Sequence, residues 1–204
     1  MRHSREESLR TRRRIVLAAR RVFALRGVSR TTMEQIAAAA GVTRGAVYGH
    51  FADKAALFQC MREQVKLPLV DVIDSALLDS RDDPLAAVER FLLAVFDALR
   101  DDAATRETLR ILNFKCEYVG EIGRDMQRQA RRAAELSSRL ERAYRRAARS
   151  GRLRRGVTPR LAALETTALL VGMVRLWLLE GPVRRLRDRA TALARAHVAS
   201  LRAE

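Results

Sequence analysis

The stretch TTMEQIAAAAGVTRGAVYGHF, at residues 31–51, constrains the fold of this chain more than any other feature. It contains two short helical patterns that meet at AGVT, where Gly41 ends the first helix and Thr43 is suited to cap the second. Two capping boxes are available for the first helix: Thr31 with Glu34, or Thr32 with Gln35. A helix, a tight glycine turn and a second short helix form the helix-turn-helix arrangement, whose second helix enters the major groove of DNA.

The side chains of this motif divide into an inward and an outward set. Helical spacing turns the apolar residues toward a preceding helix, which we expect from about residues 8–11 to Gly27. The inward set is Ile36, Ala37, Ala40, Val42, Val47 and Phe51. The outward set is Arg44, Gly45, Tyr48, Gly49 and His50. Hydrogen-bonding groups gathered on one exposed face indicate an interface with a partner rather than a core.

Contacts to the DNA backbone are expected from both helix starts. The N-termini at Thr32 and Thr43 present free amide donors and the positive end of a helix dipole, which suit phosphate. Tyr48, His50 and Lys54 would add a phenol, an imidazole and an ammonium to the same backbone. The alternatives are that Tyr48 packs against the first helix and that His50 binds backbone carbonyls at a helix end.

Sequence readout requires a side chain that reaches a base edge. Arg44 is the best candidate, because its planar fork matches the two acceptors of guanine. Gly45 and Ala46 are small enough to permit close approach, and Ala46 suits a thymine methyl group. Arginines near the N-terminus would add phosphate or minor-groove contacts, with a solvated disordered arm as the alternative: Arg2, Arg5, Arg10, Arg12 and Arg13.

Positive charge is concentrated at the front of the chain. Residues 1–54 carry 12 Arg or Lys against 4 Asp or Glu, whereas residues 55–204 carry 28 against 20. The front is therefore predicted to face a polyanion. For the remainder, arginine-rich codon usage is the alternative explanation.

The composition predicts helices throughout. Four prolines and ten glycines occur in a background rich in Ala, Leu and Arg, with few aromatic and β-branched residues. Beyond the motif we expect helices near residues 53–78, 84–100, 103–114, 119–149, 159–179 and 183–201. The predicted fold is all-α with nine helices, divided into a DNA-binding domain at residues 1–54 and a helical body at residues 55–204.

Several classes of protein are not favoured by the sequence. No stretch of ten residues lacks a charge, so we expect no membrane-spanning helix and a cytoplasmic protein. Cys60 and Cys116 have no nearby histidine at metal-binding spacing, which favours reduced thiols and no metal site. The three histidines lie far apart and no phosphate-cradling glycine loop is present, so no catalytic residues and no cofactor are predicted.

The stretch TTMEQIAAAAGVTRGAVYGHFADKAAL, at residues 31–57, resembles the head of the TetR family of bacterial transcriptional regulators almost position for position. REESLRTRRRIVLAARRVFALRGV, FKCEYVGEI and WLL resemble its AcrR-like branch, the repressors of multidrug efflux pumps, so the likeness covers most of the chain. The resemblance implies DNA contacts at residues 43–46. Gly49 departs from the pattern, because many members carry an aromatic residue there.

The resemblance also implies that the body holds a small hydrophobic or amphipathic, drug-like effector. Inward-facing apolar side chains would either line that site or fill a solid core, and periodicity alone favours the core. The residues implied to line the site are Val65, Phe91, Leu92, Val95, Asn113, Leu136, Leu140, Leu170, Val171, Val174 and Arg175. Asn113 and Arg175 would be its polar groups.

A homodimer is expected, because a two-fold protein reads a palindromic operator in successive major grooves. Apolar residues of the last two helices would form the contact, the alternative being that they pack within one subunit. They are Leu169, Met173, Leu176, Trp177, Leu186, Leu193, Val198 and Leu201. The sequence thus predicts an effector-released repressor, with control of an efflux operon as the main hypothesis. A regulator of a metabolic operon and a non-specific architectural DNA-binding protein are the alternatives.

Overall fold

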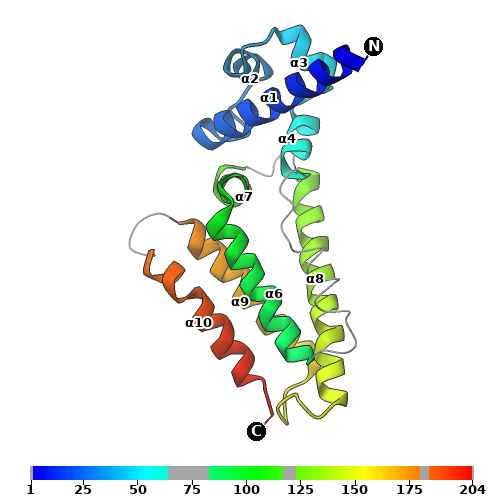
Figure 1. Cartoon of the computed structure of the whole chain (residues 1–204), viewed down its shortest axis with the longest axis vertical. Helices are drawn as coiled ribbons and strands as arrows, with labels where there is room; N and C mark the ends of the chain where they lie inside the picture. Colours follow the sequence, from blue (N-terminus) through cyan, green and yellow to red (C-terminus); the bar gives the residue numbers. More distant parts are fainter. Residues whose placement is uncertain (1, 64–82, 117–122, 180–183, 204) are drawn as a thin grey trace. The chain divides into compact units, whose positions relative to one another are not determined.

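The computed structural model describes residues 2–63, 83–116, 123–179 and 184–203. Within these ranges the chain forms nine α-helices and one π-helical turn, which confirms the predicted all-α fold (Figure 1). The elements are α1 (Arg2–Arg26), α2 (Met33–Ala40), α3 (Arg44–His50), α4 (Lys54–Glu63), α6 (Pro84–Asp101), α7 (Ala103–Arg110), η1 (Ile111–Lys115), α8 (Gly123–Arg149), α9 (Pro159–Leu178) and α10 (Arg184–Ser200). The predicted continuation of α4 toward residue 78 lies outside the described residues.

The elements pack into two compact units. The first, here called the head unit, contains α1 to α4 together with α7 and η1; the second, the body unit, contains α6, α9, α10 and α8 from Gln127 onward. The expected functional division into residues 1–54 and 55–204 stays a prediction.

The first helix is longer than the sequence predicted. We expected a start near residues 8–11, whereas α1 begins at Arg2. The residues before Ser8 include good helix formers and no breaker, so the helix propagates toward the N-terminus instead of ending in a disordered arm. At the other end Gly27 adopts a φ of 80°, in the left-handed region, and ends the helix as predicted.

The core of the head unit contains the predicted inward set. Five of its members are buried, and Val42 packs against them as a partly buried residue. The buried members are Ile36, Ala37, Ala40, Val47 and Phe51. Phe23 of α1 meets Phe58 of α4 edge to face, with ring centroids 5.9 Å apart. The helix-turn-helix pair therefore rests on a fixed platform of α1 and α4.

The segment α7–η1 also belongs to the head unit. Ile111 is fully buried in the head core, and Leu112 and Cys116 pack against it. The backbone N–H of Val28 donates to the carbonyl oxygen of Lys115 at 2.9 Å, which ties the turn after α1 to the end of η1. No local pattern of residues predicts this long-range packing.

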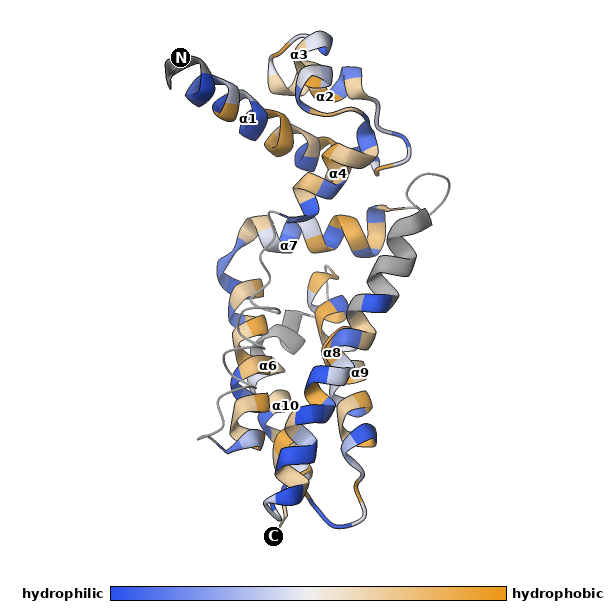
Figure 2. Cartoon of the chain, turned by 90° about the vertical axis from the view of Figure 1, so that its right-hand side faces the viewer, coloured by the Kyte–Doolittle hydropathy of each residue, from blue (hydrophilic) through white to orange (hydrophobic). Residues whose placement is uncertain are grey.

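The body unit is built from amphipathic helices with defined starts. Asp83 caps α6 by accepting from the N–H of Leu85 at 3.0 Å, and Thr158 caps α9 by accepting from the N–H of Leu161 at 3.2 Å. A proline follows each cap at the first helical position. Apolar and polar residues alternate in patches along α6, α8 and α10, as amphipathic helices require (Figure 2).

The helix α9 departs from the expectation that no segment would be apolar enough to span a membrane. Of the helices in the described ranges, it alone is long and apolar enough to do so by length and composition. Its buried side includes Ala162, Thr166 and Leu170, which pack in the body unit, and the helix carries Glu165 and Arg175 on its exposed surface. Core helices of globular proteins pass the same test, so α9 is explained as a core helix.

A buried polar cluster joins three helices of the body unit. The hydroxyl groups of Tyr144 and Thr166 lie 2.6 Å apart, and the Thr166 hydroxyl lies 2.8 Å from Nε2 of His197. Thr166 also donates to the carbonyl oxygen of Ala162 at 2.8 Å. Because Thr166 has a single proton to donate, Tyr144 and His197 act as the donors to its oxygen. Burial raises the pKa of Tyr144 to about 12, so its phenol stays protonated.

Candidate nucleic-acid interface

Both helices of the motif carry the predicted caps. Thr32 accepts from the N–H of Gln35 at 3.3 Å, and the Gln35 side chain accepts from the N–H of Thr32 at 3.1 Å, so the second of the two possible capping boxes forms. Thr31 is buried instead, and its hydroxyl donates to the carbonyl oxygen of Gly27 at 2.7 Å. Thr43 accepts from the N–H of Ala46 at 3.1 Å.

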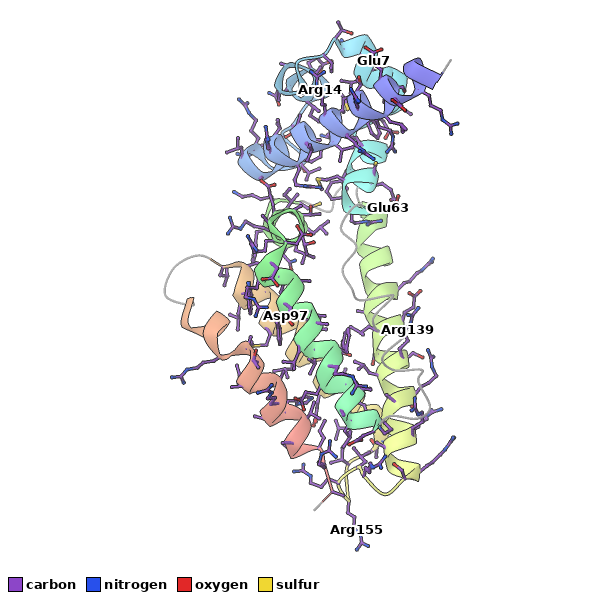
Figure 3. All side chains as sticks on the ribbon, in the orientation of Figure 1. Glu7, Arg14, Glu63, Asp97, Arg139 and Arg155 are labelled. Carbon is purple, nitrogen blue, oxygen red and sulfur yellow. The ribbon has the colours of Figure 1, made fainter. Side chains whose placement is uncertain are left out.

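The turn between α2 and α3 is fixed by a residue that sequence reasoning missed. Gly41 has a φ of 62°, and Arg14 of α1 donates through Nη2 to the carbonyl oxygens of Ala40 at 2.8 Å and Gly41 at 3.2 Å (Figure 3). The guanidinium therefore satisfies carbonyls that the end of α2 leaves without helical partners. Several other arginines lie near Arg14 in the sequence, so the sequence pattern does not single out Arg14 for this contact.

The face of α3 is open to solvent. Arg44, Gly45, Tyr48 and Gly49 are exposed, whereas Ala46 and His50 are half-buried. Tyr48 is 43% exposed and therefore does not pack into the core. A Cβ atom added at Gly49 would have no neighbour within 4 Å. The chain's own packing does not require a glycine there, and the space is available to an external partner.

Arg44 is held in place by two neighbours. Its Nε atom lies 3.0 Å from Oε1 of Glu34 on α2, and its guanidinium carbon lies 5.3 Å from the ring centroid of Tyr48. A backbone hydrogen bond, a hydrogen bond from Thr32 and the charge of Arg44 lower the pKa of Glu34 in spite of some desolvation, so the carboxylate is ionised at neutral pH. The arrangement orders a side chain that remains 66% exposed.

Lys54 has a structural role that the sequence did not indicate. Its Nζ atom donates to the carbonyl oxygens of Ser29 at 3.1 Å and Thr31 at 3.0 Å, fastening the turn before α2. These bonds use two of the three ammonium protons. Close by in the head unit, the guanidinium of Arg12 lies 5.0 Å from the ring centroid of Phe51.

The residues expected to line an effector site are only partly brought together. In the body unit six of them are buried: Phe91, Leu92, Val95, Leu136, Leu140 and Leu170. Val174 is half-buried, whereas Val171 and Arg175 are exposed. Asn113 is exposed in η1 of the head unit, where its Nδ2 donates to the carbonyl oxygen of Leu109 at 2.8 Å. Val65 lies outside the described residues.

The residues expected at a dimer interface fall into two groups. Met173, Trp177, Val198 and Leu201 are buried within one chain, which matches the alternative of packing inside a subunit. Trp177 stacks on Phe96 with ring centroids 5.8 Å apart and planes inclined by 2°. Leu176 and Leu193 are exposed, Leu169 is half-buried, and the side chain of Leu186 is not among those described.

Further apolar side chains are exposed on α9 and directly after it. They are Leu161, Leu164, Val171 and Leu179. Leu161, Leu164 and Val171 are separated by three and seven residues, which places them on one side of the helix. Leu161 and Leu164 were not predicted as interface residues, although their spacing was a usable signal.

Two family models match the chain. The model of bacterial regulatory proteins of the tetR family matches residues 15–61, and that of the C-terminal region of MAATS-type transcriptional repressors matches residues 83–202. The first match covers the capped helices described above.

Known proteins resemble nearly the full length. The transcriptional regulator TtgR of Pseudomonas putida is 35% identical over 179 residues, which are 88% of this chain and 85% of TtgR. The crystal structure of NalD, the secondary repressor of the MexAB-OprM multidrug efflux pump in Pseudomonas aeruginosa, is 35% identical with a TM-score of 0.84 and covers 96% of this chain and 98% of NalD. A complex of SmeT with triclosan is 33% identical with a TM-score of 0.78, covering 93% of this chain and 90% of SmeT.

Proposed function

Because this chain belongs to the tetR family of bacterial regulatory proteins, and its body to the MAATS-type transcriptional repressors, we propose that it controls a multidrug efflux operon in response to a drug-like effector. It is a DNA-binding transcriptional regulator and not an enzyme. We place its action in the cytoplasm, where it reaches chromosomal DNA. The single observation that carries its DNA-binding part is the exposed α3, capped at both ends, with Arg44 ordered on its face; the efflux and effector parts rest on the likeness to NalD and SmeT.

DNA recognition by this face divides into two tasks. We assign base reading to Arg44, which would place its fork on a guanine, with Gly45 and Ala46 permitting the approach. Phosphate contacts are assigned to the helix starts and the remaining polar groups, which position the motif without reading sequence. These are Thr32, Thr43, Tyr48, Gly49 through its backbone, His50 and Lys54. Lys54 has one ammonium proton left for this role.

Glu34 supports base reading indirectly. Its carboxylate binds Nε of Arg44, and Tyr48 lies beside the same guanidinium, so the side chain loses less conformational freedom when it meets a base. A carboxylate next to DNA also repels phosphates, which lowers affinity for all sequences alike. Glu34 is therefore assigned to discrimination rather than to affinity.

The effector is proposed to be a small hydrophobic or amphipathic molecule bound among the helices of the body unit. Its support is the likeness to NalD and to SmeT, whose structure was determined with triclosan, together with the apolar residues gathered on α6, α8 and α9. An effector that binds better to a conformation with wrongly spaced heads would release the operator by population shift. An effector with equal affinity for both conformations would have no effect.

Homodimerisation is proposed through the exposed apolar residues of α9 and α10. Leu164, Val171, Leu176 and Leu193 are each at least 38% exposed in the single chain, and an isologous contact would bury them. Two heads about 34 Å apart would then read the two halves of a palindrome.

The test compares two DNA duplexes at one fixed salt concentration. A palindrome from the DNA upstream of the chain's own gene or of a neighbouring efflux operon should bind at least about 1,000-fold more tightly than random DNA. Equal affinities would contradict specific repression and support architectural binding. Triclosan serves as the effector probe: release of the palindrome, with a change in fluorescence of the single tryptophan, Trp177, is the expected result.

A further inference from the structure

A second concentration of positive charge lies outside the head. Residues 139–160, here called the α8–α9 basic segment, contain nine arginines and one acidic residue, Glu141. The rest of residues 55–204 contains 19 basic and 19 acidic residues. The entire excess charge of this part of the chain therefore lies in one short segment. A uniform enrichment in arginine would not produce that distribution.

Most of these arginines are exposed and few are neutralised. Seven of them are exposed: Arg142, Arg145, Arg149, Arg152, Arg154, Arg155 and Arg160. Glu141 pairs with Arg145 at 2.7 Å, and the charge of Arg152 acts on Asp83. Within the described ranges, no hydrogen bond or ion pair engages the side chains of the other five. Figure 3 shows Arg155 extending away from the loop after α8.

The backbone that carries these side chains is fixed. The loop after α8 bonds to the C-terminal residues, through the N–H of Arg154 to the carbonyl of Leu201 at 2.9 Å and the N–H of Ala203 to the carbonyl of Arg152 at 2.8 Å. Leu153 is buried between these two contacts. The arginines consequently project from an ordered surface and not from a flexible tail.

We propose that the α8–α9 basic segment binds the phosphate backbone of a second DNA duplex while α3 holds the operator. The guanidinium group of arginine can donate two parallel hydrogen bonds to two oxygens of one phosphate. On α8, Arg142, Arg145 and Arg149 are separated by three and four residues, which sets neighbouring side chains about 5–6 Å apart along one side of the helix. A row of cations at this spacing suits a linear row of phosphates. Such binding is independent of sequence.

The surroundings favour DNA over a membrane surface. Basic surfaces that bind membranes insert large apolar side chains beside the charges. On α8 and in the loop after it, the exposed neighbours of the arginines are small, namely Ala148, Ser150, Gly151 and Gly156, and Leu153 is buried; the exposed Leu161 adjoins Arg160 alone, on α9. The arginines of α8 and of the loop therefore offer charge without a large apolar side chain beside them.

The experiment measures binding of a short random-sequence duplex by the full-length protein as a function of salt. The test variant carries R142Q, R149Q, R154Q and R155Q. The matched control removes the same charge from exposed arginines elsewhere in the body unit, with R100Q, R131Q, R189Q and R195Q. Each phosphate contact contributes about 0.9 to the slope of log K against log salt, so the test variant should lower the slope by roughly 3 to 4. The control should leave it within about 1 of the wild-type value.

Two further variants separate this proposal from the function of α3. A protein with R44A and Y48A should still bind the random duplex, and adding the four test substitutions should remove that residual binding. Lysine at the same four positions should preserve the slope, which shows that charge and not misfolding is responsible. Equal decreases of the salt-dependence slope in the test and control variants would overturn the proposal. So would segment-dependent binding to phosphatidylglycerol vesicles with an unchanged DNA slope.

Discussion

One polar cluster of the head unit and one of the body unit are arranged in opposite ways. In the head, Glu34, Arg44 and Tyr48 contact one another on an exposed surface. In the body, Tyr144, Thr166 and His197 join three helices, and two of the three side chains are fully buried. An exposed cluster keeps hydrogen-bonding capacity for a partner. A buried cluster satisfies its own groups and fixes how the helices pack.

This difference predicts where substitutions act. Changes in the exposed cluster should alter recognition with little effect on stability, because exposed groups exchange one set of solvent contacts for another. Changes in the body should alter stability first, because each buried group there has partners that cannot be replaced by water.

The largest effect is expected from Phe91→Ala in the body unit. Phe91 is fully buried, so the substitution should lower the free energy of unfolding by about 3–5 kcal/mol, measured with urea at fixed protein concentration. Tyr48→Ala on the exposed face is the control and should change it by less than about 0.5 kcal/mol. A small loss for Phe91→Ala, combined with altered triclosan binding, would show that Phe91 lines a cavity instead of filling a core.

Arg44→Ala should weaken discrimination between the operator and a duplex with one guanine replaced by about 1–3 kcal/mol. Unfolding, dimerisation and triclosan binding should remain those of the wild type, since Arg44 is exposed. Arg26→Ala removes an exposed charge at the end of α1 and should reduce affinity for both duplexes equally. Unchanged discrimination by Arg44→Ala would remove this residue from base reading.

The head could be predicted from sequence because its determinants are local. Each cap lies within three residues of the N–H that it accepts, and Gly41 stands where the left-handed backbone is needed. The structure resolves the choice between Thr31 and Thr32, which local pattern left open. The contacts of Arg14 and Lys54 with distant carbonyls span more than 20 residues and have no local signature.

The body was harder to predict because apolar periodicity does not say what covers a face. Trp177 and Val171 both occur in an apolar stretch of α9, yet Trp177 stacks on Phe96 and Val171 is 55% exposed. The π-helical turn η1 and its packing against α1 also depend on long-range contacts. The expected site residues therefore separate into buried and exposed groups only when the tertiary structure is known.

Tyr144→Phe perturbs the buried cluster less than Phe91→Ala perturbs the core. The substitution keeps the ring and removes one hydrogen bond to Thr166, while Thr166 keeps its bonds to Ala162 and His197. The free energy of unfolding, measured with urea, should fall by about 1 kcal/mol. Tyr48→Phe is the matched control, because it removes the same hydroxyl from a ring that is 43% exposed, and it should have a smaller effect. An equal loss in both variants would contradict a specific role for the cluster.

Glu34→Gln should separate discrimination from affinity in the exposed cluster. Losing the carboxylate removes repulsion of phosphates, so affinity for random DNA should rise. Discrimination should fall less than it does in Arg44→Ala, because Arg44 is still present and only its ordering by an exposed ion pair is lost. The effect on discrimination should vanish in the Arg44→Ala background. A fall of the same size in that background would show that Glu34 acts without Arg44.

The smallest expected effect is a pH dependence from His197. Burial lowers the pKa of this imidazole, although the charge of Glu165 opposes the shift. The folded state therefore binds a proton less readily than the unfolded chain, whose histidine pKa is about 6.5. The contribution of His197 to the free energy of unfolding is fully present above about pH 6.5 and is lost as the pH falls toward the folded-state pKa. Urea unfolding of wild type and His197→Gln at several pH values measures it: the difference between them should shrink on acidification. A difference that grows on acidification would mean that the folded body favours the protonated imidazole. That result would contradict a lowered pKa of His197 in the buried cluster.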